Sequence, residues 1–312
     1  MFDAVIGVFT LTDSASKWLQ LLRANFLVLT VVTVFAGLAV SFYEHYTVNV
    51  LNAVLCLVGA LLAHMAVNVF NNYFDYKLGV DKYTPKTPFS GGINLIVDGQ
   101  IKPSTAFYTG ALCFIGAALV GVYFLRIFFW SLLPIVLYGA VSIYFYTAYL
   151  SRFPALSEII AGTNYGFIVL GAALTQYGDV GLAGFAVFIL VSILVGLLLF
   201  LNEFPDVEAD RMAGRRHLVI LLGRRKASRL YVALLIFLYF LVVLFVGLKI
   251  LPLTCLLLLA TGWLSYKASY ITLKNYDDVG GIVPALAFNV LIILTGISLI
   301  GVGLVLGAFI RF

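Results

Sequence analysis

The chain has 312 residues, of which 63% are hydrophobic and only 11% are charged, with a mean hydropathy of +1.09 and a formal net charge of +5. About a quarter of the residues of a soluble domain are charged, so the 19 basic and 14 acidic side chains here cannot cover a soluble surface. This composition excludes a soluble enzyme, a disordered chain and a secreted disulfide scaffold, and indicates a membrane protein.

Apolar windows divide the chain into candidate membrane spans. Residues 1–22 come first and are expected to lie as a short amphipathic segment on the membrane surface. A helix that crosses about 30 Å of hydrocarbon needs roughly 20 apolar residues. Such windows occupy approximately residues 24–43, 50–74, 105–125, 128–149, 155–176, 180–204, 228–248, 250–270 and 282–310. The sequence therefore predicts an all-α, polytopic bundle of nine transmembrane helices, because no window alternates in polarity as a barrel strand would.

Basic residues separate to one side of this arrangement. Only Arg126, Lys249 and Arg311 fall in connections on the other side. The positive-inside rule then predicts a cytoplasmic N-terminus, cytoplasmic loops at 75–104 and 205–227, and a C-terminus outside. Since the positive charge follows the membrane side, we expect the lipid bilayer as a partner and no nucleic acid.

Acidic residues gather where the positive-inside rule gives no reason for them. Half of the carboxylates lie at the end of the second or the sixth window or directly after it: Asp75, Asp81, Asp98, Glu203, Asp206, Glu208 and Asp210. Asn71 and Asp75 are separated by the same number of residues as Asn202 and Asp206. Both stretches are predicted on one side, with four spans between them. The pattern indicates a pseudo-repeat of four-helix units with one added helix, and such repeats commonly place a site at their interface.

The spacing of these residues is typical of a metal site. Residues four apart share a helix face, where like charges repel by a few tenths of a kcal/mol per pair. Carboxylate and amide oxygens are ligands that Mg²⁺ accepts together with substrate phosphates. The candidate metal ligands are Asn71, Asp75, Asp81, Asn202, Asp206 and Asp210. A solvated helix end paired with nearby arginines is the competing interpretation, and the occurrence of two matched motifs favours the metal.

Further residues are candidates for binding the rest of a substrate. A diphosphate needs additional cations, for which the candidates are Lys77, Lys86, Arg152 and Arg215; topology alone also explains such charges. Ring faces can stabilise a carbocation by about 1–2 kcal/mol, which suggests a role for Tyr144, Tyr146 and Tyr149 beside the simpler one of interfacial aromatics. His64 and Asn164 are candidate pocket residues, although a histidine bonded to a neighbouring helix is the plainer interpretation.

The two motifs resemble those of a known family. The stretch from Asn71 to Asp81, NNYFDYKLGVD, is similar to the first aspartate-rich motif of the UbiA superfamily of intramembrane prenyltransferases. The stretch from Asn202 to Arg216, NEFPDVEADRMAGRR, is similar to the second. The resemblance extends over nearly the whole chain and implies a single membrane domain over residues 1–312.

The resemblance also implies a reaction. Mg²⁺ ions held by both motifs would bind a polyprenyl diphosphate and assist departure of diphosphate, and an aromatic acceptor would capture the allylic cation away from water. The residues expected to carry the reaction are Asp75, Asp206, Arg152 and Tyr146. Lys86 lies roughly where many members have an Arg-Pro pair, here Lys86-Thr87-Pro88.

Details of the motifs resemble one branch of this family. The six-residue step from Asp75 to Asp81, followed by Gly91-Gly92, is similar to the dihydroxynaphthoate prenyltransferases of menaquinone synthesis. This likeness leads us to expect an enzyme of quinone synthesis in a prokaryotic cell membrane. The chain departs from the branch at Asn72, because those enzymes usually carry Asp directly after the first Asn.

Two alternatives stay open from the sequence. One is another acceptor of the hydroxybenzoate, haem, chlorophyll or lipid-glycerol type. The other is a cation-coupled secondary transporter, whose acidic residues would lie near the bilayer midplane rather than at helix ends.

Overall fold

The computed structural model describes residues 13–79, 81, 87 and 93–310, and these residues form helices and no strand. Lys86 and the glycines at 91 and 92 lie outside the described residues. The α-helices are α1 (Asp13–Leu21), α2 (Leu27–His45), α3 (Val50–Leu78), α4 (Pro103–Ile127), α5 (Phe129–Ala148), α6 (Leu156–Tyr177), α7 (Leu182–Met212), α8 (Leu218–Leu222), α9 (Arg224–Gly247), α10 (Gly262–Asn275) and α11 (Val279–Ile310). Within the described residues, 3-10 helices join some of them: η1 (Ala24–Phe26), η3 (Leu150–Arg152) and η4 (Leu253–Thr261).

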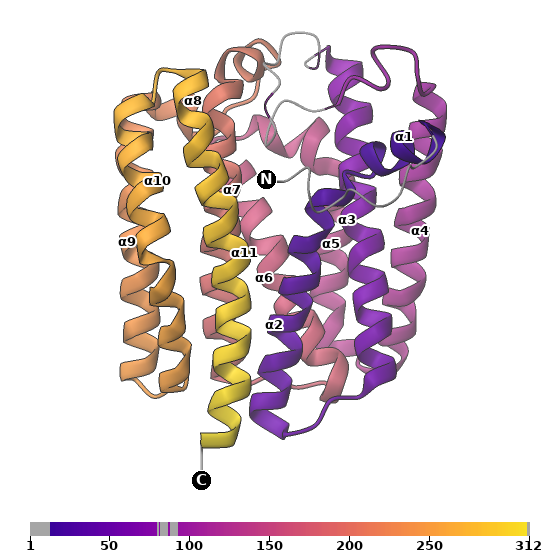
Figure 1. Ribbon diagram of the computed structural model, residues 1–312. Coiled ribbons are helices and arrows are strands. Elements are labelled where there is room, and N and C mark those ends of the chain that lie inside the picture. Colours follow the sequence, from indigo (N-terminus) through magenta and orange to yellow (C-terminus); the bar gives the residue numbers. More distant parts are fainter. Residues whose placement is uncertain (1–12, 80, 82–86, 88–92, 311–312) are drawn as a thin grey trace.

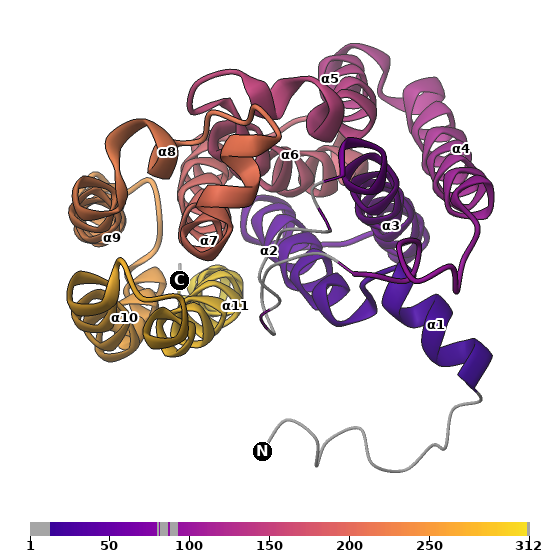
Figure 2. The same ribbon diagram turned by 90° about the horizontal axis from the view of Figure 1, so that it is seen from above.

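The long helices run side by side as a bundle (Figure 1). At its centre α6 and α7 pack against each other, and α2 and α11 pack against both each other and α7. Seen from above, α4 lies at one side of the bundle and α9 with α10 at the other (Figure 2). The C-terminal ends of α3 and α7 lie at the same end of the bundle as α8, and the C-terminus of the chain lies at the opposite end (Figure 1). The all-α membrane fold predicted from the sequence is thus confirmed.

The predicted number of nine spans is not confirmed. Among the described residues, eight helices are long and apolar enough to cross a membrane. The window at 250–270 forms η4 and then the 14-residue α10 instead of one long α-helix. Apolar residues are concentrated in η4, whereas α10 carries Ser265, Tyr266 and Lys267. The two elements pack in succession against α9 and α11.

The two helices that carry the motifs are similar in length and in the position of the motif, which supports the predicted repeat. α3 has 29 residues and α7 has 31, and each holds its Asn-x-x-x-Asp pair near its C-terminal end. Gly79 ends α3 with a left-handed φ of 73°, a conformation that glycine adopts without steric cost. The second helix is longer than expected: α7 continues through Pro205 to Met212, so the first part of the segment predicted as a loop at 205–227 is helical. Its buried Phe204 and Val207 pack into the main apolar core and stabilise this extension.

Close approach of α6 and α7 depends on small residues. A Cβ added at Gly162 would lie 2.2 Å from the backbone oxygen of Ser192, and one at Gly166 would lie 2.2 Å from the Ser192 hydroxyl. A backbone oxygen cannot move aside as the end of a side chain can. The α6–α7 pair that positions the second motif therefore requires glycine at 162.

Gly162→Ala is expected to destabilise the bundle, because the helices must separate to admit the methyl group. Overpacking of this kind costs about 1–3 kcal/mol, and contact with backbone places it at the upper end. Thermal unfolding of the purified protein in detergent measures the loss. Gly139→Ala is the matched control: it lies within α5, and no atom is within 4 Å of its added Cβ. An equal fall in both variants would contradict the packing argument.

Candidate active site

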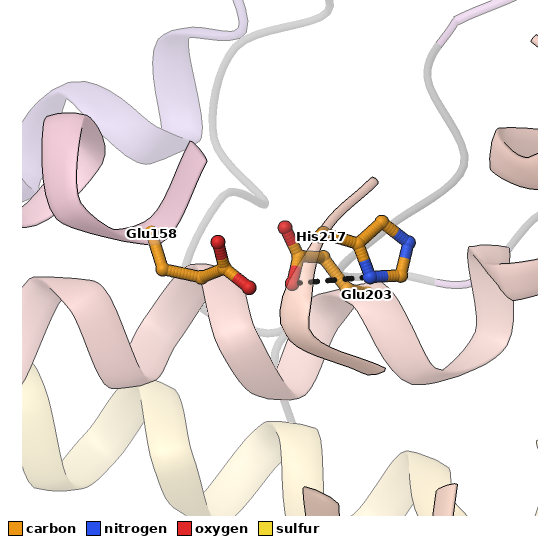
Figure 3. A group of neighbouring side chains, drawn as sticks. All are labelled: Glu158, Glu203 and His217. Atoms are coloured by element: carbon orange, nitrogen blue, oxygen red, sulfur yellow. Dashed lines mark ion pairs between the residues drawn. The ribbon is translucent and has the colours of Figure 1, made fainter. Parts of the chain in front are cut away.

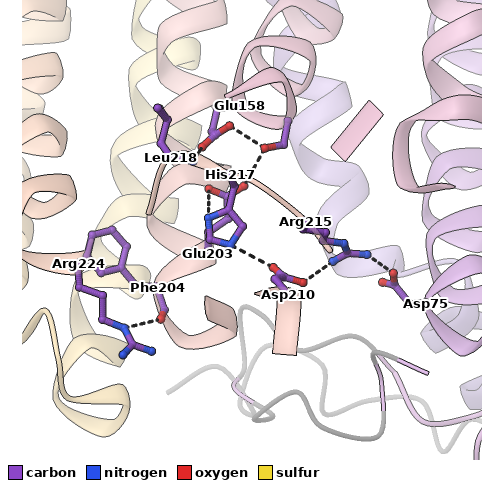
Figure 4. A network of polar contacts seen from close by, with 10 residues as sticks. Asp75, Glu158, Glu203, Phe204, Asp210, Arg215, His217, Leu218 and Arg224 are labelled. Atoms are coloured by element: carbon purple, nitrogen blue, oxygen red, sulfur yellow. Dashed lines mark hydrogen bonds and ion pairs between the residues drawn. The ribbon is translucent and has the colours of Figure 1, made fainter. Parts of the chain in front are cut away.

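The two motifs meet through one arginine. Arg215 donates to Asp75 of α3 through one guanidinium nitrogen and to Asp210 of α7 through the other, the second at 2.7 Å (Figure 4). All three side chains are largely buried, with 17% of Arg215, 14% of Asp75 and 7% of Asp210 exposed. The structure therefore brings together motifs that lie four spans apart in the sequence.

A tight turn after α7 holds Arg215 in this position. Gly214 adopts a left-handed φ of 77°, and the backbone N–H of Arg215 donates to the carbonyl of Asp210 at 2.9 Å. Burial acts to lower the pKa of Arg215, but the carboxylates of Asp75 and Asp210 outweigh it and hold that pKa above its usual range. The guanidinium is therefore a permanent positive charge between the two motifs.

The segment after this turn is tied to the connection between α5 and α6. Arg216 N–H donates to the carbonyl of Ser151 at 3.3 Å, and Ala155 N–H donates to the carbonyl of Arg216 at 3.3 Å. One step further, the backbone N–H of Leu218 donates to the Glu158 carboxylate at 2.6 Å. These bonds fix the segment that follows Arg215, and the turn at Gly214 fixes the chain directly before it.

A second arginine, Arg23, comes from the N-terminal segment and lies near acids of both motifs. It follows α1 with a left-handed φ of 50°, and its guanidinium donates to the Asn72 side-chain oxygen at 2.6 and 3.2 Å. Asn72 is 1% exposed and donates in turn to the carbonyl of Leu21 at 3.1 Å. Asn72 therefore joins the first motif to the end of α1.

Arg23 also interacts electrostatically with three acids of the two motifs. Burial lowers the pKa of Arg23, while Asp75, Asp81 and Asp206 act to raise it. Arg23 was not among the residues predicted for the site. A signal was present, since Arg23 directly follows the predicted amphipathic segment 1–22 and Asn72 stands where the naphthoate enzymes that the motif resembles usually have Asp.

Oxygen atoms of both motifs are the remaining candidate members of the site. Asp81 is 4% exposed just beyond the end of α3, and Asp206 lies one turn after Asn202 on α7. The side-chain oxygen of Asn202 is buried without a hydrogen-bond partner in the described part of the chain. Asn71 lies one turn before Asp75 on α3. This set of carboxylate and amide oxygens fits a hard divalent cation such as Mg²⁺.

Some predicted cation-binding residues lie elsewhere. Lys77 is exposed and its ammonium lies 5.1 Å from the centre of the Tyr73 ring. It comes two residues after Asp75, which places it roughly on the opposite side of α3. Arg152 ends η3 with an exposed side chain. Of the proposed diphosphate-binding residues that the structure describes, only Arg215 contacts a motif acid.

The three candidate tyrosines have different surroundings. Tyr146 interacts electrostatically with Glu203 and Arg215, next to the site. Tyr144 packs edge-on against Phe70 and Phe74 of α3, and Tyr149 is 56% exposed beside Phe145. Tyr146 is therefore the tyrosine that the structure brings to the motifs.

The candidate pocket residues take part in bonds between helices. His64 Nδ1 lies 2.7 Å from the Thr30 hydroxyl, and Tyr165 OH lies 3.1 Å from His64 Nε2. These contacts join α2, α3 and α6 about two helical turns before the first motif on α3. Asn164 accepts from Ser142 at 2.7 Å, which joins α5 to α6.

The fold and the paired motifs define a membrane-embedded prenyltransferase class, and comparison with known proteins agrees. The chain belongs to the UbiA prenyltransferase family, whose model matches residues 30–289. The resemblance drawn from the motifs is thereby confirmed, and the chain is an integral-membrane enzyme that transfers prenyl groups.

Particular relatives differ in the reaction that their names describe. The chain is 30% identical over 217 residues to the 1,4-dihydroxy-2-naphthoate octaprenyltransferase of Bacillus subtilis, covering 69% of this chain and 68% of that protein. It is 29% identical over 179 residues to the digeranylgeranylglyceryl phosphate synthase of Thermococcus kodakarensis, covering 56% of this chain and 58% of that protein. A solved UbiA homologue from Archaeoglobus fulgidus, bound to DMAPP and Mg²⁺, superposes with a TM-score of 0.60 at 15% identity, covering 94% of this chain and 98% of that chain.

Proposed function

We propose that this enzyme transfers a polyprenyl group from a polyprenyl diphosphate to an aromatic acceptor of the dihydroxynaphthoate type, with Mg²⁺ as cofactor. The observation that carries the proposal is the bridge of Arg215 between Asp75 and Asp210, which makes one site of two motifs. The likeness to the Bacillus subtilis naphthoate enzyme supports this acceptor, and the Mg²⁺-bound Archaeoglobus fulgidus homologue supports the cofactor.

The chain's own groups supply most of what this reaction needs. Asn71, Asp75, Asp81, Asn202, Asp206 and Asp210 provide the oxygen donors for the metal. Bound Mg²⁺ would stabilise the negative charge that develops on the leaving diphosphate. Arg23 and Arg215 add positive charge at the same place, and bidentate guanidinium groups suit phosphate oxygens.

Tyr146 is proposed to face the carbocation side of the site. It lies in the last turns of α5, and it interacts with Arg215 rather than with the aromatic cluster around Phe70. A ring face near the departing group attracts positive charge by about 1–2 kcal/mol when water is excluded. Lys86 and Arg152 are kept as proposed contacts for the diphosphate once substrate is bound.

The location of the enzyme follows from the same proposal. The motif-bearing ends of α3 and α7 would face the cytoplasm of a prokaryotic cell, where the basic loops are predicted, and the C-terminus would lie outside. Polyprenyl chains would then extend from the site into the hydrocarbon between the helices.

A different acceptor is the second candidate. The match to a digeranylgeranylglyceryl phosphate synthase favours a lipid-glycerol acceptor as the alternative to an aromatic one. A cation-coupled transporter is not supported, because the motif acids lie near helix ends at one end of the bundle (Figure 1).

Incubation of the purified protein with labelled geranylgeranyl diphosphate, Mg²⁺ and three separate acceptors tests the proposal. The acceptors are 1,4-dihydroxy-2-naphthoate, 4-hydroxybenzoate and geranylgeranylglyceryl phosphate. We expect label in the naphthoate product, and loss of product when a chelator removes the metal. Product with only the glyceryl acceptor would refute the aromatic assignment, and undiminished product in chelator would refute the role of Mg²⁺.

A further inference from the structure

Next to the motif acids, three buried side chains converge that the proposed reaction leaves without a role. Glu158 lies in the first turn of α6, Glu203 lies on α7 and His217 precedes α8 (Figure 3). Their exposed fractions are 6%, 5% and 2%. One ligand atom from each of the three lies within 4.8 Å of those of the other two. The cluster is thus a compact set of two carboxylates and one imidazole, closed off from solvent.

The distance between His217 and Glu203 suits a shared ion better than a direct hydrogen bond. His217 Nδ1 lies 3.5 Å from Glu203 Oε2, and neither atom has a hydrogen-bond partner in the described part of the chain. Two ligand atoms that are each about 2.0–2.2 Å from a tetrahedrally coordinated ion lie about 3.4 Å apart. The unsatisfied nitrogen and oxygen therefore have the separation that neighbouring ligands of one metal would show.

Surrounding groups orient the three side chains as the outer shell of a metal site does. The other ring nitrogen of His217 lies 3.4 Å from the Asp210 carboxylate. Glu158 accepts from Leu218 N–H at 2.6 Å and from the Ser157 hydroxyl at 2.6 Å (Figure 4). A histidine ligand commonly turns its second nitrogen to a carboxylate, and ligating carboxylates are themselves hydrogen-bonded.

Charge balance points in the same direction. Two carboxylates buried side by side are costly unless a cation or a shared proton compensates them. One divalent ion with Glu158, Glu203 and a neutral His217 makes a site of zero net charge. Imidazole favours ions such as Zn²⁺, and carboxylate accepts Mn²⁺ as well, whereas Mg²⁺ takes oxygen ligands.

We propose that Glu158, Glu203 and His217 form a binding site for one divalent transition-metal ion, Zn²⁺ or Mn²⁺, separate from the Mg²⁺ held by the two Asn-x-x-x-Asp motifs. Asp210 lies between the two sites, since it faces His217 with one oxygen and Arg215 with the other. The ion would hold the segment after α7 against α6 and would orient Asp210. This site does not depend on which acceptor the enzyme uses.

Metal retention by the full chain tests the proposal without any activity assay. Purified protein in detergent is stripped with a chelator, equilibrated with a slight molar excess of ZnCl₂ or MnCl₂ in a larger excess of Mg²⁺, separated by gel filtration and analysed for metal. We expect about one ion per wild-type chain. Loss of a supporting group at a metal site weakens binding by about 10–100-fold, so the isosteric ligand changes Glu203→Gln and His217→Asn should weaken it at least tenfold.

Asp206→Asn is the matched control, because it alters a motif acid on the same helix outside the cluster, and it should keep the ion. X-ray absorption at the zinc edge of the wild-type protein gives a second readout that needs no variant, and one imidazole with oxygen ligands is expected. Absence of a retained ion in the wild type would overturn the site in favour of a shared proton. Retention in the ligand variants, loss in Asp206→Asn, or a spectrum without imidazole would also overturn it.

Discussion

Asp206→Asn is expected to lower prenyl transfer by about three orders of magnitude while the protein stays folded. A metal ion contributes several kcal/mol of charge stabilisation in the transition state, and about 1.4 kcal/mol corresponds to a factor of ten in rate. Asparagine keeps the shape of the side chain but removes the charge that would hold the metal. The measurement is kcat/KM at saturating Mg²⁺ with labelled polyprenyl diphosphate, together with thermal unfolding.

Asp98→Asn is the control for this prediction. Asp98 belongs to the same acidic stretch as Asp81 in the sequence, but it lies in an exposed turn before α4. Its loss should leave transfer unchanged. Near wild-type turnover in Asp206→Asn would show that the second motif does not hold the metal, and equal losses in both variants would point to net charge instead of position.

Arg215→Met is expected to have the largest effect on stability. The change removes a guanidinium that pairs with both Asp75 and Asp210. Removing one partner of a buried ion pair costs about 3–5 kcal/mol, because the remaining charge is left buried and uncompensated. We therefore expect a clear fall in the thermal unfolding midpoint in detergent, measured in the absence of metal and substrate.

Arg211→Met provides a matched comparison on the same turn. Arg211 pairs with Glu208 at 3.4 Å, and 58% and 65% of these two side chains are exposed. Exposed pairs of this kind contribute about 0–1 kcal/mol, so the unfolding midpoint should barely change. Similar midpoints for the two variants would mean that Arg215 does not join the motifs as the structure shows. Partial recovery in the double variant Arg215→Met with Asp210→Asn would support the buried-charge explanation.

Features that repeat along the chain were accessible from the sequence. Apolar windows predicted the membrane helices, because a span must satisfy its backbone internally and must present about 20 apolar residues to lipid. The window at 250–270 was the exception, since hydropathy does not distinguish η4 followed by a short α10 from one continuous helix. The Asn-x-x-x-Asp pairs were equally visible, because a four-residue spacing places both side chains on one helix face.

The basic partners of the motif acids could not be identified from the sequence. The sequence offered many basic residues on one side, and nothing in their spacing separates Arg215, which joins two helices, from Lys77, which covers a tyrosine ring. Arg23 and His217 were not selected at all. Each lies in a connection whose path depends on long-range contacts, such as Asn72 with Leu21 and Glu158 with Leu218.

Hydropathy and spacing within single helices were therefore enough to predict the class of fold, the two motifs and the family. The cations that meet the acids, and the place where Glu158, Glu203 and His217 converge, depend on how distant segments pack together. Those arrangements require α3, α6, α7 and the connection after α7 to approach one another, and the close packing at Gly162 provides the α6–α7 part of that approach.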